Sequence, residues 1–220
     1  YIKDYQITSS HSTFKVINKN KEYTFTTKLL GKHNIYNSLA SIIVLNKIGY
    51  TFEEINKILN IVNGPIGRME NIHYKNNNII IDYAHTPDGI ENVLKTAKEL
   101  KHNQIITIMG CGGGTGSDRE KRSTMGKLVL ELSNKTIFTN DNPRDEEPNQ
   151  IINDLLKEKT NNNYIIELDR KKAIEQGIKM LTNNDILLIL GKGHENYQII
   201  GNKKTHFSDK ETVEEIIKEN

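Results

Sequence analysis

Four short apolar runs in this chain each end in a polar loop whose side chains could bind a small charged molecule. The runs have the length of β-strands and cover residues 78–81, 104–109, 136–139 and 185–190. The loops after them contain carboxylates, guanidinium groups, imidazoles and glycines, and begin Asp82-Tyr83-Ala84-His85, Gly110-Cys111-Gly112, Asp141-Asn142-Pro143-Arg144 and Gly191-Lys192-Gly193-His194-Glu195. If the strands are parallel, all four loops leave the same edge of the sheet, where open α/β folds bind ligands. We therefore expect one crevice lined by four loops.

The glycine-rich loop at residues 110–116 could wrap a phosphate or a carboxylate with its backbone N–H groups. It does not fit the dinucleotide pattern G-x-G-x-x-G, and the chain contains no G-x-x-x-x-G-K-[ST]. It also resembles the glycine box of tubulin-like GTPases, but Asp118 stands where that box needs glycine. A mobile turn is the alternative interpretation. Arg119, Lys121 and Arg122 follow the loop and favour an anionic ligand.

The loop at residues 141–144 combines a carboxylate, an amide and a planar bidentate donor beside a stiffening proline. This set suits the amine and the carboxylate of an amino acid, although Asp, Asn and Pro are also common in ordinary turns. In the loop at residues 191–195, two glycines let the backbone approach a ligand closely ahead of His194 and Glu195. The spacing of His, Cys and carboxylates matches no structural zinc site, so we expect no such metal. Magnesium held mainly by phosphates would leave no local signature.

Composition excludes several classes of partner. The 220 residues contain 30 Lys and Arg against 28 Asp and Glu, so bulk charge does not favour nucleic acid or a membrane surface. The single cysteine, Cys111, cannot form an internal disulfide. No apolar stretch approaches the length of a membrane span, and no export signal precedes the first elements. These features predict a cytoplasmic protein.

The residue pattern in the first third of the chain predicts a partial domain. Alternation around Phe14 and Phe25 is typical of a β-hairpin at the edge of a sheet. A helix ending at Gly49 follows, and then a second helix with a capping box of Thr51 and Glu54, ending near residue 61. Since the chain begins without Met and the hairpin lacks an obvious partner, we expect it to start inside a larger protein. We place the domain boundary between residues 63 and 64.

From residue 68 onward, strands and helices alternate. Helices are expected near residues 87–100, 123–132, 148–159 and 170–181, and a further strand at residues 164–168. A hairpin around residues 201–202 and a final helix capped by Ser208 and Glu211 complete the domain. Such alternation predicts an α/β fold with a mostly parallel sheet flanked by helices.

Six motifs taken in order closely resemble those of the Mur ligases of peptidoglycan synthesis, and within that family the members that add meso-diaminopimelate. They are Gly31-Lys-His-Asn34-Ile-Tyr-Asn37, Gly67-Arg68-Met-Glu70, Asp82-Tyr-Ala-His-Thr-Pro-Asp88, Gly110-Cys-Gly-Gly, Asp141-Asn-Pro-Arg144 and Gly191-Lys-Gly-His-Glu-Asn-Tyr-Gln198. The resemblance runs from about residue 31 to the C-terminus. It implies that residues 64–220 form the Rossmann-like C-terminal domain and that residues 1–63 are the end of the central ATPase domain.

The resemblance also implies an activity. Mur ligases use ATP to phosphorylate the carboxylate of a growing peptide, and an incoming amine then attacks the acyl phosphate. The expected cofactors are ATP and Mg²⁺, and the expected substrates are UDP-N-acetylmuramoyl-L-alanyl-D-glutamate and meso-diaminopimelate, with a monomeric enzyme and no nucleic acid or membrane partner. The family's phosphate-binding loop and its magnesium-binding carboxylates lie upstream of these motifs, so the chain alone is expected to be inactive.

By the same resemblance, six residues would contact ATP: Asn34, Asn37, Arg68, Asp82, Tyr83 and His85. The amino acid would contact Arg119, Asp141, Asn142, Arg144, Gly191 and Glu195, although Arg122 could take the place of Arg119. No metal ligand is assigned within the chain.

Two alternatives remain open at this point. One is a related ligase that adds lysine or glutamate, such as a folylpolyglutamate synthetase, and the other is a non-catalytic module that binds an amino acid or a nucleotide. Arg144 argues against lysine, because a guanidinium can pair bidentately with the distal carboxylate of diaminopimelate but repels the terminal ammonium of lysine.

Overall fold

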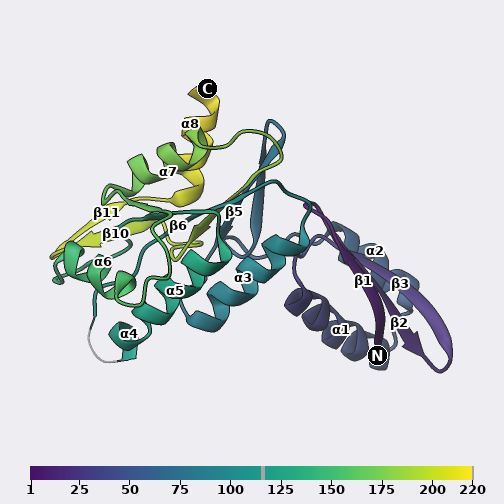
Figure 1. The fold of residues 1–220 in the computed structure, drawn as a ribbon. Coiled ribbons are helices and arrows are strands. Elements are labelled where there is room, and N and C mark those ends of the chain that lie inside the picture. Colours follow the sequence, from purple (N-terminus) through teal and green to yellow (C-terminus); the bar gives the residue numbers. More distant parts are fainter. Residues whose placement is uncertain (115–116, 220) are drawn as a thin grey trace. The chain divides into compact units, whose positions relative to one another are not determined.

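The computed structural model describes residues 1–114 and 117–219 and divides the chain into two compact units. The first unit comprises residues 1–65 together with 99–101, and the second comprises residues 66–98 and the chain from His102 on. Figure 1 shows the elements of both units along the chain. The division falls two residues after the boundary expected from the sequence. The assignment of the first unit to an ATPase domain stays a prediction.

The first unit contains an antiparallel sheet of three strands in the order β1 (Ile2–Ile7), β2 (Ser12–Asn18) and β3 (Lys21–Thr27). The hairpin of β2 and β3 is confirmed, but its predicted place at the edge of the sheet is wrong for β2, which pairs with both neighbours. The sequence hid β1 because the pairing register of β1 shifts between Ile2 and Asp4. Such a bulge breaks the alternation that reveals a strand.

Two helices, α1 (Lys32–Lys47) and α2 (Phe52–Ile61), complete the first unit. Their apolar side chains share a buried core with the sheet, formed by Phe14, Val16, Phe25, Ile35, Ile42 and Ile55. The predicted capping box is confirmed, since the Thr51 hydroxyl accepts from the Glu54 N–H at 3.2 Å and the Glu54 carboxylate accepts from the Thr51 N–H at 2.9 Å. Gly49 adopts the expected left-handed conformation after α1, with φ of 111°.

The second unit contains a six-stranded sheet in the order β4-β5-β9-β6-β7-β8. The bounds are β4 (Glu70–Tyr74), β5 (Asn77–Asp82), β6 (Ile105–Met109), β7 (Lys135–Phe138), β8 (Tyr164–Ile166) and β9 (Ile186–Leu190). All neighbouring strands are parallel except β4, which pairs antiparallel with β5. The parallel α/β fold is confirmed. The edge strand β4 was not predicted, because its residues are mostly polar and only partly buried.

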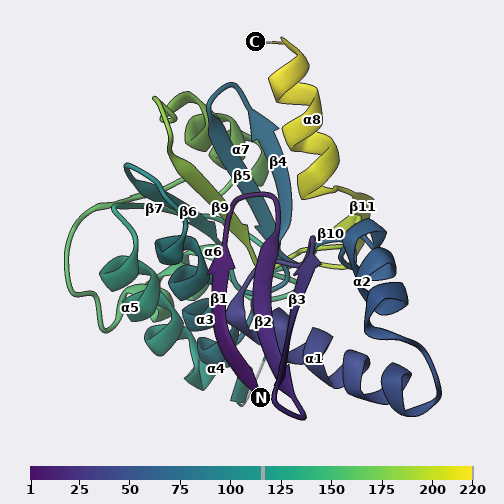
Figure 2. The same ribbon diagram turned by 90° about the vertical axis from the view of Figure 1, so that its right-hand side faces the viewer.

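Helices cover both faces of this sheet. Figures 1 and 2 show α7 (Arg170–Lys179) and α8 (Asp209–Glu219) on one face, and α3 (Pro87–Glu99) and α5 (Arg122–Leu132) on the other. Because side chains alternate along a strand, every second strand residue points to the α7 and α8 face. The core on that face contains Ile79, Ile81, Ile106, Ile108, Leu187 and Ile189, packed against Ala173, Ile174 and Val213.

The remaining elements lie around this sheet. A short helix, α4 (Ser117–Glu120), precedes α5, and α6 (Pro148–Leu156) packs against α5. The predicted closing hairpin is confirmed as β10 (Tyr197–Ile200) and β11 (Lys203–His206). The cap of α8 is only half as predicted: the Ser208 hydroxyl accepts from the Glu211 N–H at 3.3 Å, but the Glu211 carboxylate pairs with His206. Among the described residues, no helix is both long and apolar enough to cross a membrane.

Candidate functional site

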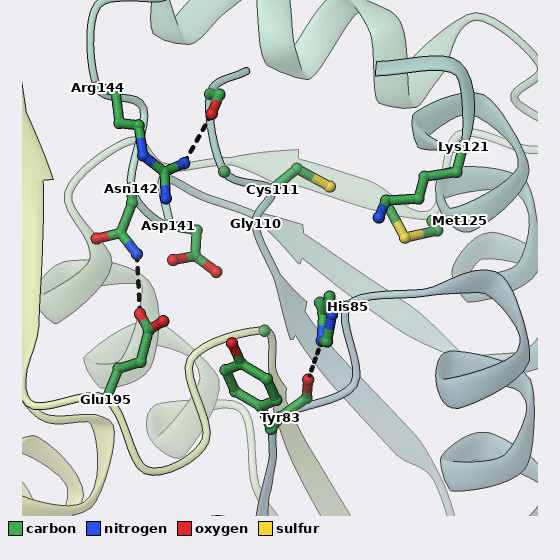
Figure 3. A pocket seen from close by; sticks show the side chains of 13 residues that line it. Tyr83, His85, Gly110, Cys111, Lys121, Met125, Asp141, Asn142, Arg144 and Glu195 are labelled. Carbon is green, nitrogen blue, oxygen red and sulfur yellow. Dashed lines mark hydrogen bonds between the residues drawn. The ribbon is translucent and has the colours of Figure 1, made fainter. Parts of the chain in front are cut away.

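One cavity of about 270 Å³ lies where β5, β6, β7 and β9 end (Figure 3). All four loops named at the outset contribute to its lining, which confirms the expected convergence. After β5 come Tyr83 and His85, after β6 Gly110, Cys111, Gly112 and Gly113, after β7 Asp141, Asn142 and Arg144, and after β9 Gly191 and Glu195; Lys121 and Met125 complete the lining. The convergence follows from the parallel sheet, whose strands all end at the same edge.

Glycines let these loops approach one another closely. A Cβ atom on Gly113 would lie 1.8 Å from the carbonyl oxygen of Pro143, far inside any contact distance. A Cβ atom on Gly191 would lie 2.6 Å from Oδ2 of Asp141, and the φ of 111° at Gly191 is itself unfavourable for other residues. Thr115 and Gly116 of the predicted glycine loop lie outside the described residues. The glycines at 113 and 191 thus have a steric role in forming the pocket.

Asp141, Asn142 and Glu195 are joined by the buried ammonium group of Lys192. The Lys192 Nζ atom lies 3.5 Å from Oδ1 of Asp141, 3.4 Å from Oδ1 of Asn142 and 3.2 Å from Oε2 of Glu195. The Asn142 amide also donates to Oε2 of Glu195 at 2.8 Å, as Figure 3 shows. These contacts fix one wall of the pocket before any ligand binds. Lys192 lies within a motif identified in the sequence, but no role was predicted for it.

Strand β10 holds the loop at residues 141–144 through hydrogen bonds of its backbone and of the Gln198 side chain. The Ile199 N–H donates to Oδ1 of Asn142 at 3.0 Å, and the Gln198 side chain donates to the carbonyl oxygen of Asp141 at 2.9 Å. The Arg144 N–H donates to the carbonyl oxygen of Ile199 at 3.1 Å. The hairpin was predicted from its turn, but this supporting role could not be read from the sequence.

Arg144 lines the pocket with its guanidinium held by the glycine loop. Its Nη1 donates to the carbonyl oxygen of Gly113 at 2.7 Å (Figure 3). The backbone of Arg144 has φ of 51°, a conformation that non-glycine residues rarely adopt. Such a conformation persists only where the surroundings enforce it, and it is common at binding sites.

Several buried cations and carboxylates lie around Asp141. Two buried cations, Arg170 and Lys192, pair with three carboxylates. Asp209 lies behind the pocket, and Asp141 and Glu195 line it. Burial raises the pKa of Asp141, although the positive charges of Arg170 and Lys192 oppose this shift. The nearby charge of Glu195 likewise raises the pKa of Tyr197, whose hydroxyl donates to Glu195 at 3.3 Å. With Arg144 on the same pocket, these cations and carboxylates are equal in number, and the buried carboxylate of Asp141 is a group whose ionised form a bound cation could stabilise.

The basic residues after the glycine loop take three different positions. Arg119 is half exposed, does not line the pocket, and pairs with Asp154 at 2.9 Å. Arg122 is fully buried and donates to Glu146 at 2.7 Å and to the carbonyl oxygen of Gly112 at 2.9 Å. Lys121, which the sequence suggested for an anionic ligand but not for the amino-acid site, lines the pocket. The assignment of Arg119, or of its alternative Arg122, to the amino acid stays a prediction that the pocket lining does not favour.

Glu146 is the partner that holds Arg122 in place. Its carboxylate accepts from both terminal nitrogens of Arg122 and from the Gly114 N–H at 3.1 Å. The hydrogen bonds from Arg122 lower the pKa of Glu146 to about 2. The ion pair therefore remains charged at any physiological pH and fixes the glycine loop from behind.

Near Tyr83, aromatic and basic side chains form a small cluster. The Arg68 guanidinium lies 4.8 Å from the centre of the Tyr83 ring, and the rings of His85 and His194 lie 4.7 and 5.0 Å from it. Asp82 is buried and accepts from the backbone N–H groups of Met69 and Ala84 at 2.7 and 2.8 Å. Tyr83 and His85 also line the pocket, whereas Arg68 and Asp82 do not. Their assignment to ATP stays a prediction.

Asn34 and Asn37 belong to the first unit. Both lie on α1, where the Asn34 amide donates to the carbonyl oxygen of Leu30 at 2.8 Å and the Asn37 amide donates to Oδ1 of Asn34 at 3.3 Å. Their assignment to the adenine stays a prediction. In the part of the chain that the structure describes, no cluster of three or more His, Cys, Asp or Glu side chains could hold a metal ion.

Comparison with known families gives two matches. Residues 67–193 match the family described as "Mur ligase, glutamate ligase domain", and residues 1–45 match the one described as "Mur ligase middle domain". Among curated proteins, the UDP-N-acetylmuramoyl-L-alanyl-D-glutamate–2,6-diaminopimelate ligase of Aquifex aeolicus is 46% identical over 209 residues, which cover 94% of this chain and 42% of the relative. The ligase of the same name from Prochlorococcus marinus is 39% identical and covers 100% of this chain and 44% of the relative.

Solved structures agree with this result. A structure of UDP-N-acetylmuramoyl-L-alanyl-D-glutamate–2,6-diaminopimelate ligase is 33% identical with a TM-score of 0.75, covering 100% of this chain and 45% of that one. A folylpolyglutamate synthase from Thermotoga maritima has a TM-score of 0.66 at 18% identity, covering 86% of this chain and 43% of that one, so it shows the fold alone. The chain thus spans less than half the length of the relatives that it matches. Since the C-terminal domain match covers more than half of its residues, the chain belongs to the Mur ligase family.

Proposed function

We propose that this chain is the amino-acid-binding part of an ATP-dependent ligase that joins meso-diaminopimelate to UDP-N-acetylmuramoyl-L-alanyl-D-glutamate in peptidoglycan synthesis. The curated relatives described above carry the name of that activity. The observation that carries the proposal for this chain is the placement of Arg144 on the same pocket as Asp141 and Glu195. A cation and two carboxylates match a ligand with both carboxylate and ammonium groups.

The charge pattern fits one end of diaminopimelate. Its distal carboxylate would pair with the Arg144 guanidinium, one nitrogen of which is held by Gly113 while the planar group can still offer further N–H donors. The ammonium beside that carboxylate would lie against Asp141 and Glu195, whose carboxylate oxygens can accept its hydrogen bonds. An ammonium at this position would also favour the ionised form of Asp141, whose pKa is raised in the free chain.

ATP, when bound, would supply the phosphoryl group that activates the carboxylate of the dipeptide substrate. Arg68, Tyr83 and His85 suit such a ligand, because a guanidinium group and imidazoles can contact phosphates and the aromatic ring offers a stacking surface. Asn34 and Asn37 are proposed separately as adenine contacts. Any Mg²⁺ would be held mainly by phosphate oxygens. Because ATP is a cytoplasmic metabolite, we place the enzyme in the cytoplasm, and we propose that it acts as a monomer.

The role of the described residues in this reaction is to bind and orient the amino acid. Lys192 and β10 fix the polar groups before binding, so little side-chain freedom is lost when the ligand arrives. An amine held at a fixed position reacts as if it were highly concentrated, which accounts for a large part of many rate enhancements.

The proposal is tested with the ligase that contains this chain and a panel of amino acids. Purified enzyme, ATP, Mg²⁺ and the UDP-linked dipeptide are mixed with meso-diaminopimelate, L-lysine or L-glutamate, and product formation is measured. We expect product with diaminopimelate, and at least about 100-fold lower kcat/KM with lysine, since the distal ammonium would face Arg144. Equal or better use of lysine or glutamate would contradict the proposal, and binding of diaminopimelate without any ligation would favour a non-catalytic module.

A further inference from the structure

Arg170 is a buried charged residue that lies behind the pocket and is not part of its lining. It is the first residue of α7, and its side chain is 0% exposed. A positive charge at the N-terminus of a helix opposes the helix dipole, and Asp169 already caps this helix by accepting from the Lys172 N–H at 3.2 Å. Stabilisation of α7 therefore does not explain the presence of an arginine here.

The guanidinium of Arg170 makes hydrogen bonds in two directions. Toward α8, Nε donates to Oδ1 of Asp209 at 2.7 Å and Nη2 donates to Oδ2 at 2.8 Å, which is a bidentate ion pair. Toward the sheet, Nη2 donates to the carbonyl oxygen of Leu190 at 3.0 Å, and Nη1 donates to that of Asn140 at 3.3 Å. One side chain thus connects the C-terminal helix to the end of β9 and to the loop after β7.

Each of these two carbonyl groups belongs to the residue directly before one that lines the pocket. Leu190 directly precedes Gly191, and Asn140 directly precedes Asp141, and both of these following residues line the pocket. Strands β9 and β7 are not neighbours, because β6 lies between them in the sheet. The two strands therefore share no ladder hydrogen bonds with each other. Side chains already link their loops, through Lys192 and through the bond from Asn142 to Glu195, and Arg170 adds a hydrogen-bonded link between the two backbones.

The clearance between these two loops is small. A Cβ atom on Gly191 would lie 2.6 Å from Oδ2 of Asp141, so no side chain fits between the backbone of one loop and the carboxylate of the other. Arg170 also acts on this carboxylate through its charge, which opposes the rise that burial causes in the pKa of Asp141. A displacement on the order of 1 Å at such a site can lower activity about 100-fold.

We infer that Arg170 is a positioning residue of the amino-acid site, which sets the β7 and β9 loops in register behind Asp141 and Gly191. This inference rests on the proposed function and adds a residue outside the pocket to it. A buried ion pair on its own is a weak source of stability, because desolvation offsets its attraction. The two backbone carbonyls give Arg170 a task that Asp209 does not share.

The comparison of Arg170→Lys with Asp209→Asn tests this inference. Both changes weaken the ion pair, but only Arg170→Lys removes the planar guanidinium group that donates to the Leu190 and Asn140 carbonyl oxygens. In the ligase that contains this chain, we expect Arg170→Lys to raise the KM for diaminopimelate about tenfold or more, with less than about threefold change in the KM for ATP. Asp209→Asn should change both constants less than about threefold, although thermal unfolding should show that both variants are destabilised.

Equal KM values for diaminopimelate in the two variants would overturn the inference, as would destabilisation by Arg170→Lys without a change in this KM. If Arg170→Lys does not fold, the double variant Arg170→Met with Asp209→Leu removes both buried charges together, a change that proteins often tolerate. This double variant should also raise the KM for diaminopimelate about tenfold, and a wild-type value would again overturn the inference. A wild-type ligase that does not use diaminopimelate would instead contradict the proposed function.

Discussion

The two sides of the pocket present different chemical groups, side chains on one and mainly backbone on the other. On the polar side, Asp141, Asn142, Arg144 and Glu195 present charged and hydrogen-bonding groups that Lys192 and β10 hold in place. On the glycine side, residues 110–113 present mainly backbone, which Arg122 and Arg144 hold by its carbonyl oxygens at Gly112 and Gly113. The polar side can select a ligand by charge, whereas the glycine side determines how closely the loops and the ligand can approach.

Each side also depends on a carboxylate from the loop after β7, and the two carboxylates respond to their surroundings in opposite ways. Asp141 belongs to the polar side, and burial raises its pKa. Glu146 supports the glycine side through Arg122, which lowers its pKa to about 2. In the free chain, the ionised form of Asp141 is thus destabilised, whereas the ionised form of Glu146 is stabilised.

The largest effect is expected from removing the cation of the polar side. In the ligase that contains this chain, Arg144→Ala should raise the KM for diaminopimelate at least about 30-fold, because the bound ligand would bury its pairing with Arg144, and truncating one partner of a buried charge pair costs about 2–5 kcal/mol. The KM for ATP should change far less. Arg144→Lys keeps the charge but loses the planar fork, so its effect should fall between those of the wild type and Ala. Equal effects of Arg144→Ala on both substrates would count against the assignment.

A smaller effect is expected where the two loops touch. Gly191→Ala places a methyl group 2.6 Å from Oδ2 of Asp141 at a φ of 111°, and such overpacking lowers the free energy of unfolding by about 1–3 kcal/mol. Gly49→Ala is the matched control, since Gly49 has the same φ of 111° but nothing lies within 4 Å of its Cβ position. Urea denaturation should show the larger loss for Gly191→Ala. Equal losses would mean that only backbone conformation matters at these glycines.

On the glycine side, Glu146→Gln should lower the free energy of unfolding at pH 7 by roughly 1–2 kcal/mol, after allowance for solvent screening. The pKa of Glu146 is lowered from 4.5 to about 2 in the folded chain, so its contribution is present above pH 4.5 and is lost as the pH falls toward 2. The difference between wild type and variant should therefore shrink over this range in urea denaturation. A difference that stays constant from pH 7 to pH 2 would contradict the role given to the Arg122 pair.

Asp141→Asn should give the opposite and smallest effect on stability. Because the folded pKa of Asp141 is raised above 3.8, the wild-type chain loses free energy of unfolding as the pH rises from about 4 through that pKa. The variant lacks this loss and should be the more stable chain at pH 7, while it binds diaminopimelate more weakly. Urea denaturation at pH 4 and pH 7 measures the difference. A variant less stable than the wild type at pH 7 would show that Arg170 and Lys192 outweigh the burial of Asp141.

Much of the site could be predicted from the sequence because it depends on the ends of parallel strands. Apolar runs located β5, β6, β7 and β9, and the parallel arrangement placed the loops after them together. Short motifs such as residues 141–144 also have their charged and polar side chains at neighbouring positions, where the sequence shows them directly. The convergence of these loops needed no information beyond strand length, turn residues and the rule for open α/β sheets.

Other features depend on distances that the sequence does not display. The pairing of Arg170 with Asp209 joins residues 39 positions apart, and no local pattern marks either residue. Which of Arg119, Lys121 and Arg122 reaches the pocket depends on the direction of a short helix turn, and the structure places Lys121 there. Strand β1 was hidden by its bulge, and β4 by its polar edge. Local patterns located the loops, and tertiary packing determined which side chains face the ligand.

The central claim is that the Arg144 guanidinium recognises the distal carboxylate of diaminopimelate. Isothermal titration calorimetry of the 220-residue chain and its Arg144→Met variant, each with meso-diaminopimelate and with L-lysine, measures this recognition directly. We predict that the wild type prefers diaminopimelate by about 30-fold or more and that the variant loses most of this preference, because lysine lacks the distal carboxylate. An equal preference in both chains would contradict the claim.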